Sequence, residues 1–216
     1  MQIPSRFNGP PGTGNGGWSA GAFALACGGD GVLEVTLRTP PPLDTPLSRD
    51  GMSFFAPDGT LVASVAESNG VGEPVPPVSF SEATVVSKDY PGFTAHPFPT
   101  CYVCGPDRRD GLRLFPGLLP DGRTAAPWRV PGDVRDETMW AALDCPGGWA
   151  VLHVGQTYML GRIAARVVAV PEPGAACVVV GRADSMAGRK ALTTSTVYGP
   201  DGAPLATARG TWIAVT

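Results

Sequence analysis

Charged residues are scarce in this chain. Asp, Glu, Lys and Arg make up 16% of its 216 residues, the net charge is −3, and Lys and Arg form no run. We therefore expect no nucleic-acid partner, although a local basic patch could still hold a small anion. No apolar run approaches the length that spans a bilayer, and residues 1–6 are not followed by the apolar stretch of a signal peptide. We expect no membrane contact.

Cysteine and histidine are also few. The five cysteines are odd in number and show no disulfide-framework spacing, which predicts reduced thiols and a cytoplasmic protein. The two histidines, His96 and His153, make a Ser-His-Asp hydrolase difficult to build.

Glycine and proline, by contrast, are abundant. The 29 glycines and 24 prolines show no collagen-like period, so they are typical of many turns between short strands. One hairpin pattern occurs twice, at residues 54–64 and 197–207, where β-rich runs flank a Pro-Asp-Gly turn. A third Pro-Asp-Gly at residues 120–122 makes the turn alone a weak sign of repetition. The order of elements around each turn carries more weight.

That order is a helix followed by antiparallel strands, and it occurs twice. The first helix is expected at residues 18–27, and the second runs from an Asp136 N-cap to Cys145, where Pro146 bends or ends it. A short helix is expected at 80–89, and strands at 32–38, 48–56, 60–68, 112–119, 123–130, 157–170, 175–186, 189–198 and 203–215. The chain divides into an N-terminal half (1–70), a Pro-rich connector (71–110) and a C-terminal half (111–216).

Two such halves resemble the tandem, or double, hotdog arrangement of acyl-CoA thioesterases. Three segments carry the resemblance: the glycine-rich helix entry at residues 14–18, the helix segment at 140–144 and the final hairpin at 201–211. Residues 96–108 are also similar to uncharacterised actinobacterial thioesterase-like proteins. The resemblance implies an α+β protein of two hotdog folds, each a central helix wrapped by a curved antiparallel β-sheet.

Asp144 is the sole acid between residues 139 and 154, a run rich in Ala, Leu, Trp and Gly. A carboxylate in apolar surroundings must be paired, exposed or used. The resemblance implies a catalytic Asp here, acting as general base on the water that attacks a thioester carbonyl. A solvated acid near a helix end is the alternative. Overlaying the helices on Trp18 and Trp140 puts Asp144 opposite Ala22, which predicts one chemical site per chain.

The helix entry at Asn15, Gly16 and Gly17 is the complementary candidate. A helix N-terminus presents free N–H groups that can bind a developing oxyanion, and glycine lets a substrate approach the backbone. The resemblance places such a glycine here, often after a His, whereas this chain has Asn15. The alternative is a loop made glycine-rich only by tight packing.

Further candidates contact the substrate away from the reacting atoms. We assign to substrate binding the tryptophans Trp18 and Trp140 with Phe55, the strand-end residues Glu67 and Thr211, and the hairpin-tip cations Arg182, Arg189 and Lys190. Such a tip could bind the phosphates of coenzyme A. A solvated turn, and strand ends that face solvent, are the alternatives.

Cys101 and Cys104 form a Cys-x-x-Cys pair, which is half of a zinc site. No second pair exists, and although His96 could be a third ligand, a fourth is not evident. We therefore expect two reduced, packed thiols and no metal.

The sequence predicts a hydrolase that cleaves an acyl-CoA thioester by Asp-assisted attack of water. No cofactor is expected, because coenzyme A enters as part of the substrate, and a homo-oligomer remains open. The first alternative is a hotdog protein that binds acyl-CoA or another apolar ligand without chemistry. An enoyl-CoA hydratase ranks last, because neither His96 nor His153 lies beside an Asp after a helix entry.

Overall fold

The computed structural model describes residues 1–29, 31–152 and 156–215. The strands in these ranges are, in chain order, β1 (Leu33–Leu37), β2 (Ser48–Asp50), β3 (Ser53–Phe55), β4 (Leu61–Glu67), β5 (Gly117–Leu118), β6 (Thr124–Arg129), β7 (Thr157–Val167), β8 (Ala176–Ala187), β9 (Lys190–Tyr198) and β10 (Pro204–Val215). The helices are α1 (Gly16–Cys27), α2 (Phe80–Val86) and α3 (Asp136–Trp149), with 3-10 turns at η1 (Ser5–Phe7), η2 (Ser87–Asp89) and η3 (Pro91–Phe93). The prediction of two central helices among many antiparallel strands is confirmed.

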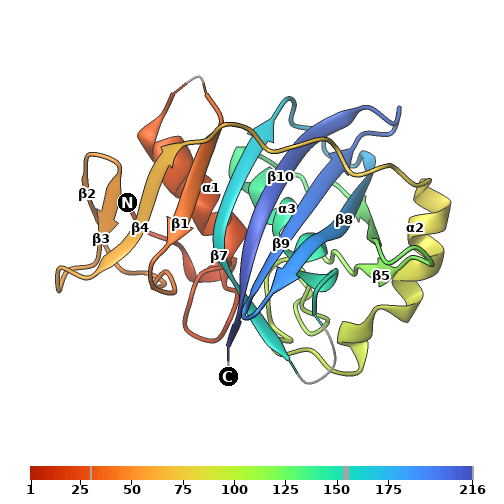
Figure 1. Cartoon of the computed structure of the whole chain (residues 1–216), viewed down its shortest axis with the longest axis horizontal. Coiled ribbons are helices and arrows are strands. Elements are labelled where there is room, and N and C mark those ends of the chain that lie inside the picture. The colour runs from red at the N-terminus through yellow and green to blue at the C-terminus, as the bar shows by residue number, and fades with distance from the viewer. Residues whose placement is uncertain (30, 153–155, 216) are drawn as a thin grey trace.

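All the strands join one sheet in the order β2-β3-β4-β1-β7-β10-β9-β8-β6-β5 (Figure 1). The hairpin pattern that occurs twice in the sequence forms β3–β4 and β9–β10, and the two hairpins have equivalent strand neighbours in the sheet. In each, the second strand of the hairpin pairs with the first strand after the central helix, as β4 pairs with β1 and β10 pairs with β7. The strands before the connector (β2, β3, β4 and β1) meet the strands after it where β1 pairs antiparallel with β7, and Leu33 lies opposite Ala165.

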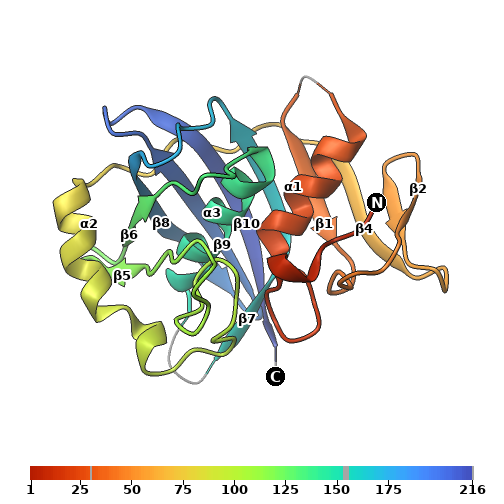
Figure 2. The ribbon, with the colours of Figure 1, turned by 180° about the vertical axis from the view of Figure 1, so that it is seen from behind.

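Helices α1 and α3 lie side by side on one face of this sheet (Figure 2). Small residues along α1 allow the close approach: a Cβ on Gly21 would lie 2.8 Å from the Trp140 Cβ. The buried stretch of α1 runs from Gly17 to Ala24, because the sheet covers one side and α3 another. A helix with no consistent polar face is stable only in such a buried position.

Helix α3 differs from the prediction at both ends. It begins at Asp136 with Arg135 as N-cap, and it continues through Pro146 to Trp149. A proline inside a helix removes a backbone hydrogen bond and displaces nearby carbonyls. Here the Ser195 hydroxyl donates to the Leu143 carbonyl at 2.5 Å, and the Thr124 hydroxyl donates to the Pro146 carbonyl at 2.7 Å. Strand side chains therefore satisfy carbonyls around the proline, and the helix does not end there.

The connector covers both faces of the sheet. After β4 the chain crosses the face opposite the helices (Figure 1), where the Val75 amide donates to the Thr196 hydroxyl at 3.0 Å. It then forms α2 at the β5 edge and passes to the helix side. The predicted strand at 112–119 is shorter than expected, because the amides of Leu112 and Leu114 donate to the carbonyls of Tyr102 and Val103 instead of a strand.

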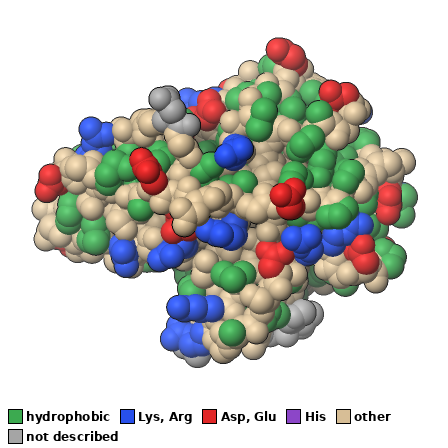
Figure 3. Space-filling view, turned by 45° about the horizontal axis from the view of Figure 1, so that its top comes forward, with side chains coloured by type: hydrophobic (Ala, Val, Ile, Leu, Met, Phe, Trp, Pro, Cys, Tyr) green, Lys and Arg blue, Asp and Glu red, His purple; other side chains and the backbone are tan. Residues whose placement is uncertain are grey.

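The surface carries charges of both signs. Figure 3 shows Lys and Arg side chains interspersed with Asp and Glu on one face, and Glu34 in β1 lies within 4 Å of Arg162 and Arg209. None of the helices in the described part of the chain has the length and apolar character needed to cross a membrane.

The packing of α1 on α3 predicts the effect of one added methyl group. We expect Gly21→Ala to lower the free energy of unfolding by about 1–3 kcal/mol, because the new Cβ overlaps the Trp140 side chain and lies 3.1 Å from the Glu137 Cα. Gly132→Ala is the control, since nothing lies within 4 Å of a Cβ there. Urea unfolding measures both, and equal stability of the two variants would contradict the tight crossing.

Candidate active site

The N-terminus of α1 is held by its N-cap residue. The Asn15 side chain accepts a hydrogen bond from the Trp18 amide through Oδ1 at 2.9 Å. Its Nδ2 donates to Asp144 Oδ2 at 2.9 Å. Asn15 therefore caps its own helix and contacts α3 at the same time.

Asp144 is buried where the two helices cross, and its two oxygens differ. Oδ2 accepts hydrogen bonds from the Gly17 amide at 2.9 Å and from Asn15, whereas Oδ1 has no partner among the described residues. Burial raises the pKa of Asp144 to about 7, against the opposing effect of the two donors. The sequence predicted that this acid must be paired, exposed or used, and the structure shows it half paired.

Gly17 is required at this contact. A Cβ there would lie 2.5 Å from the Asp144 Cβ and 2.6 Å from the Trp140 carbonyl oxygen, and the carbonyl belongs to the helix backbone and cannot move aside. The Gly17 N–H is therefore used by Asp144. The Gly16 N–H has no hydrogen-bond partner among residues 1–29, 31–152 and 156–215, and Gly16 lines the adjacent cavity. This changes the prediction that both glycine amides face a substrate.

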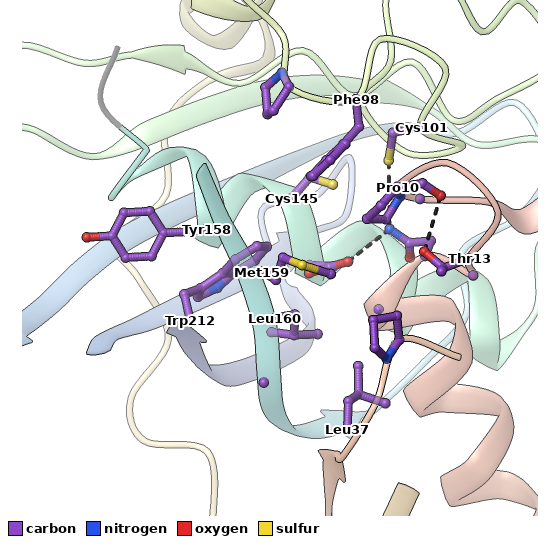
Figure 4. A pocket seen from close by; sticks show the side chains of 18 of the residues that line it. Pro10, Thr13, Leu37, Phe98, Cys101, Cys145, Tyr158, Met159, Leu160 and Trp212 are labelled. Atoms are coloured by element: carbon purple, nitrogen blue, oxygen red, sulfur yellow. Dashed lines mark hydrogen bonds between the residues drawn. The ribbon is translucent and has the colours of Figure 1, made fainter. Parts of the chain in front are cut away.

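A cavity of about 210 Å³ lies beside these residues. Its walls are mostly apolar and come from the entry of α1, the end of β1, the connector, the C-terminal half of α3, the start of β7 and the end of β10 (Figure 4). The side chains that Figure 4 labels on these walls include Leu37, Phe98, Tyr158, Met159, Leu160 and Trp212. Asn15, Gly16 and Asp144 supply polar groups at one wall.

Three cysteines form the part of the wall next to Asp144. The Sγ atoms of Cys101, Cys104 and Cys145 all lie within 4.8 Å of one another, and the residues are buried. Hydrogen bonds from the Cys104 and Cys145 side chains hold the pKa of Cys101 well below its usual range. Donation to Cys101 raises the pKa of Cys145, and burial raises that of Cys104. Asn15 Nδ2 lies 3.9 Å from Cys101 Sγ, so the thiols and the carboxylate share a neighbour.

His96 also lines the cavity. Its Nδ1 accepts a hydrogen bond from the Phe98 amide at 2.8 Å, and its Nε2 lies 3.3 Å from Cys104 Sγ. Burial lowers the pKa of His96, which favours the neutral ring. His153 lies outside the described residues.

The predicted substrate-binding residues lie elsewhere in the structure. Trp18 stacks on Phe7 with ring centroids 4.0 Å apart, and Trp140 packs on Gly21. These tryptophans do not line the cavity. Nor do the other residues predicted to contact the substrate, namely Phe55, Glu67, Thr211, Arg182, Arg189 and Lys190. The tryptophans are occupied by the packing of the helices, which leaves them no cavity-facing surface.

The hairpin tip between β8 and β9 is exposed and separate from the cavity. Arg182 is paired with Asp184 at 2.8 Å, and the Arg189 Nε donates to the Ala214 carbonyl. The cavity instead has one cation among its described lining residues, Arg38, which follows β1 and is exposed. Its Nε donates to the Ser64 hydroxyl at 3.2 Å.

Sequence reasoning missed two residues of this wall, Cys145 and Arg38, and one motif that lies outside it. Cys145 follows Asp144 directly, and its place opposite the Cys-x-x-Cys pair depends on tertiary contacts. Arg38 is the last residue of the strand predicted at residues 32–38, and a strand pattern does not indicate which cavity its end reaches. Residues 17–21 also read Gly-Trp-Ser-Ala-Gly, the letters of a nucleophile elbow. However, Ser19 lies inside α1, is fully buried and has no hydrogen-bond partner in the described chain, so no base contacts it.

Solved structures resemble this arrangement. One, a protein named only provisionally as a thioesterase from Novosphingobium aromaticivorans, matches over 99% of this chain and 93% of its own at 17% identity, with a TM-score of 0.64. Another, a conserved protein of unknown function with a hotdog fold from Alicyclobacillus acidocaldarius, matches over 100% of this chain and 92% of its own at 16% identity, with a TM-score of 0.60. This chain has a hotdog fold. No protein-family model and no curated protein matches the sequence.

The hotdog helix carrying Asp144 predicts a pH-dependent stability. The folded carboxyl has a pKa of about 7 and its ordinary value is 3.8, so the folded state holds the proton more tightly. The contribution of this carboxyl to the free energy of unfolding is fully present below about pH 4 and is lost as pH rises through about 7. The difference is on the order of 4 kcal/mol.

Asp144→Asn removes this titration while keeping an oxygen for Gly17 and Asn15. We expect the variant to gain stability relative to the wild type as pH rises from 4 to 8, measured by urea unfolding at each pH. Parallel curves for the two proteins would show that Asp144 does not titrate in this window.

Proposed function

We propose that this protein hydrolyses an acyl-CoA thioester, with Asp144 as the general base. The observation that supports the proposal is the unpartnered Oδ1 of a buried carboxylate at an apolar cavity, beside the N-terminus of a second helix. A buried oxygen without a partner costs about 1–3 kcal/mol, which folding alone does not require. Such an oxygen is suited to hold a water molecule against a substrate in the cavity.

The proposed reaction uses groups on both helices. Asp144 Oδ1 takes a proton from water as the water oxygen attacks the thioester carbonyl carbon. The carbonyl oxygen becomes an oxyanion, which the Gly16 N–H and the positive end of α1 stabilise. The C–S bond then breaks, the carboxylic acid forms, and the proton on Asp144 passes to the departing thiolate of coenzyme A. The Gly17 and Asn15 donors on Oδ2 keep Asp144 in place throughout.

The same proposal explains the repeated topology. We interpret β2–β3–β4–β1 with α1, and β7–β10–β9–β8 with α3, as two hotdog units joined between β1 and β7. The helix entry then comes from one unit and the carboxylate from the other. One chain would thus contain one site, as the single Asp144 requires.

Hydrolysis of acyl-CoA by the wild type and by Asp144→Asn tests the proposal. We expect thiol release from a panel of acyl-CoAs of different chain length, and a fall in kcat of about 10²–10⁴-fold in the variant. Asp136→Asn, at the half-buried start of the same helix and outside the cavity lining, is the control and should retain turnover. Turnover that survives in Asp144→Asn would remove the catalytic assignment. Binding of acyl-CoA without turnover by the wild type would favour the non-catalytic binding protein.

Arg38 is the proposed contact for a phosphate of coenzyme A, because it is the cation at the cavity. We expect Arg38→Gln to raise KM for acyl-CoA about fivefold, the effect of an exposed ion pair of about 1 kcal/mol, with kcat unchanged. The matched substrate is the acyl-pantetheine, which lacks the nucleotide phosphates and should show the same KM with both proteins. Arg182→Gln, at the hairpin tip, is the competing variant: an effect there and none at Arg38 would restore the tip as the phosphate site.

A further inference from the structure

Three of the five cysteines converge from two distant segments. Cys101 and Cys104 come from the connector and Cys145 from α3, and their sulfur atoms lie within 4.8 Å of one another. Zinc–sulfur bonds of about 2.3 Å in a tetrahedral site place the sulfurs about 3.8 Å apart, so a contraction of about 1 Å or less would complete the site. We infer that Cys101, Cys104 and Cys145 bind a thiophilic divalent metal ion of the Zn²⁺ class.

The turn between the first two cysteines is built for this convergence. The Gly105 amide donates to the Cys101 carbonyl at 2.9 Å, which closes the turn. A Cβ on Gly105 would lie 2.5 Å from the Cys101 nitrogen and 2.5 Å from the Pro99 carbonyl oxygen, so the turn is too tight for any other residue. The Tyr90 hydroxyl donates to the Cys104 carbonyl at 3.2 Å and fixes the far side of the turn.

The third cysteine connects this turn to the helix of the proposed active site. Cys145 follows Asp144 in α3, and all three cysteines line the same cavity. A bound ion would therefore join the connector to α3 next to the carboxylate and restrict the movement of both. The other two cysteines, Cys27 and Cys177, are not part of the cluster and supply internal controls.

His96 orients a sulfur and is not a ligand in this arrangement. Because Nδ1 accepts the Phe98 N–H, the neutral ring carries its proton on Nε2, which lies 3.3 Å from Cys104 Sγ and donates to it. A nitrogen that donates its proton cannot bind a metal at the same time. Hydrogen bonds to metal-bound sulfur from neighbouring groups are a common way of holding a ligand in place. The fourth position of the ion is then open toward the cavity.

Metal content tests this inference without any substrate. The full chain, purified under reducing conditions, is loaded with Zn²⁺, desalted and analysed by mass spectrometry of the metal. We expect about one Zn²⁺ per chain, and loss of the ion in Cys101→Ala and in Cys145→Ala. Cys177→Ala and His96→Ala should keep it, and circular dichroism checks that every variant is folded.

A second measurement needs only the wild type. Co²⁺ added in place of Zn²⁺ should give the near-ultraviolet charge-transfer band of thiolate ligands, and Zn²⁺ should displace it. A wild-type chain that takes up no Zn²⁺ and shows no such band would overturn the inference even if the cysteine variants fail to fold. Loss of the ion in Cys177→Ala, or in His96→Ala, would overturn the assignment of ligands. Thioesterase activity does not enter either measurement, so the two proposals fail independently.

Discussion

The carboxylate of Asp144 binds the N-terminus of α1, and the arrangement of the two helices depends on this contact. Oδ2 receives one backbone and one side-chain donor from that helix end, where the peptide dipoles favour negative charge. The donors reach the carboxylate because Gly17 has no side chain. Burial opposes the contact, since it raises the pKa of Asp144 to about 7. The helix crossing therefore contains a group that a purely structural interface would avoid.

The sheet determines which segments can meet at this contact. Antiparallel pairing of β1 with β7 places the two helices next to each other on one face, although they are more than 100 residues apart in the chain. The same pairing brings the start of β7 next to the end of β1 at one end of these two strands, where the cavity lies (Figure 4). The connector closes that end with its Cys-x-x-Cys turn. A segment that the sequence presents as a link between halves thus becomes a wall of the site.

The polar groups of the site have a consistent division of roles. Asn15 and Gly17 are used in holding Asp144, while the Gly16 N–H and Asp144 Oδ1 have no partner among the described residues. A free N–H is ordinary at a helix N-terminus, whereas a buried carboxylate oxygen is normally paired, and sites where such rules are broken are often functional. The apolar walls lower the local dielectric and so strengthen any hydrogen bond that a ligand or a held water molecule makes with these groups.

Much of this protein follows from local sequence. Hydrophobic alternation and Pro-Asp-Gly turns predicted the strands, and the apolar run after the glycine-rich loop predicted α1, because these patterns act over a few residues. Asp144 stood out because it is the only acid in an apolar stretch. The end of α3 was mispredicted, because carbonyls around Pro146 are satisfied by strands far away in sequence. Likewise the place of Trp18 in the helix packing, of Arg38 at the cavity and of Cys145 beside Cys101 was decided only by the tertiary structure. Periodicity identifies which residues share a face, whereas the pairing of distant strands decides what that face meets.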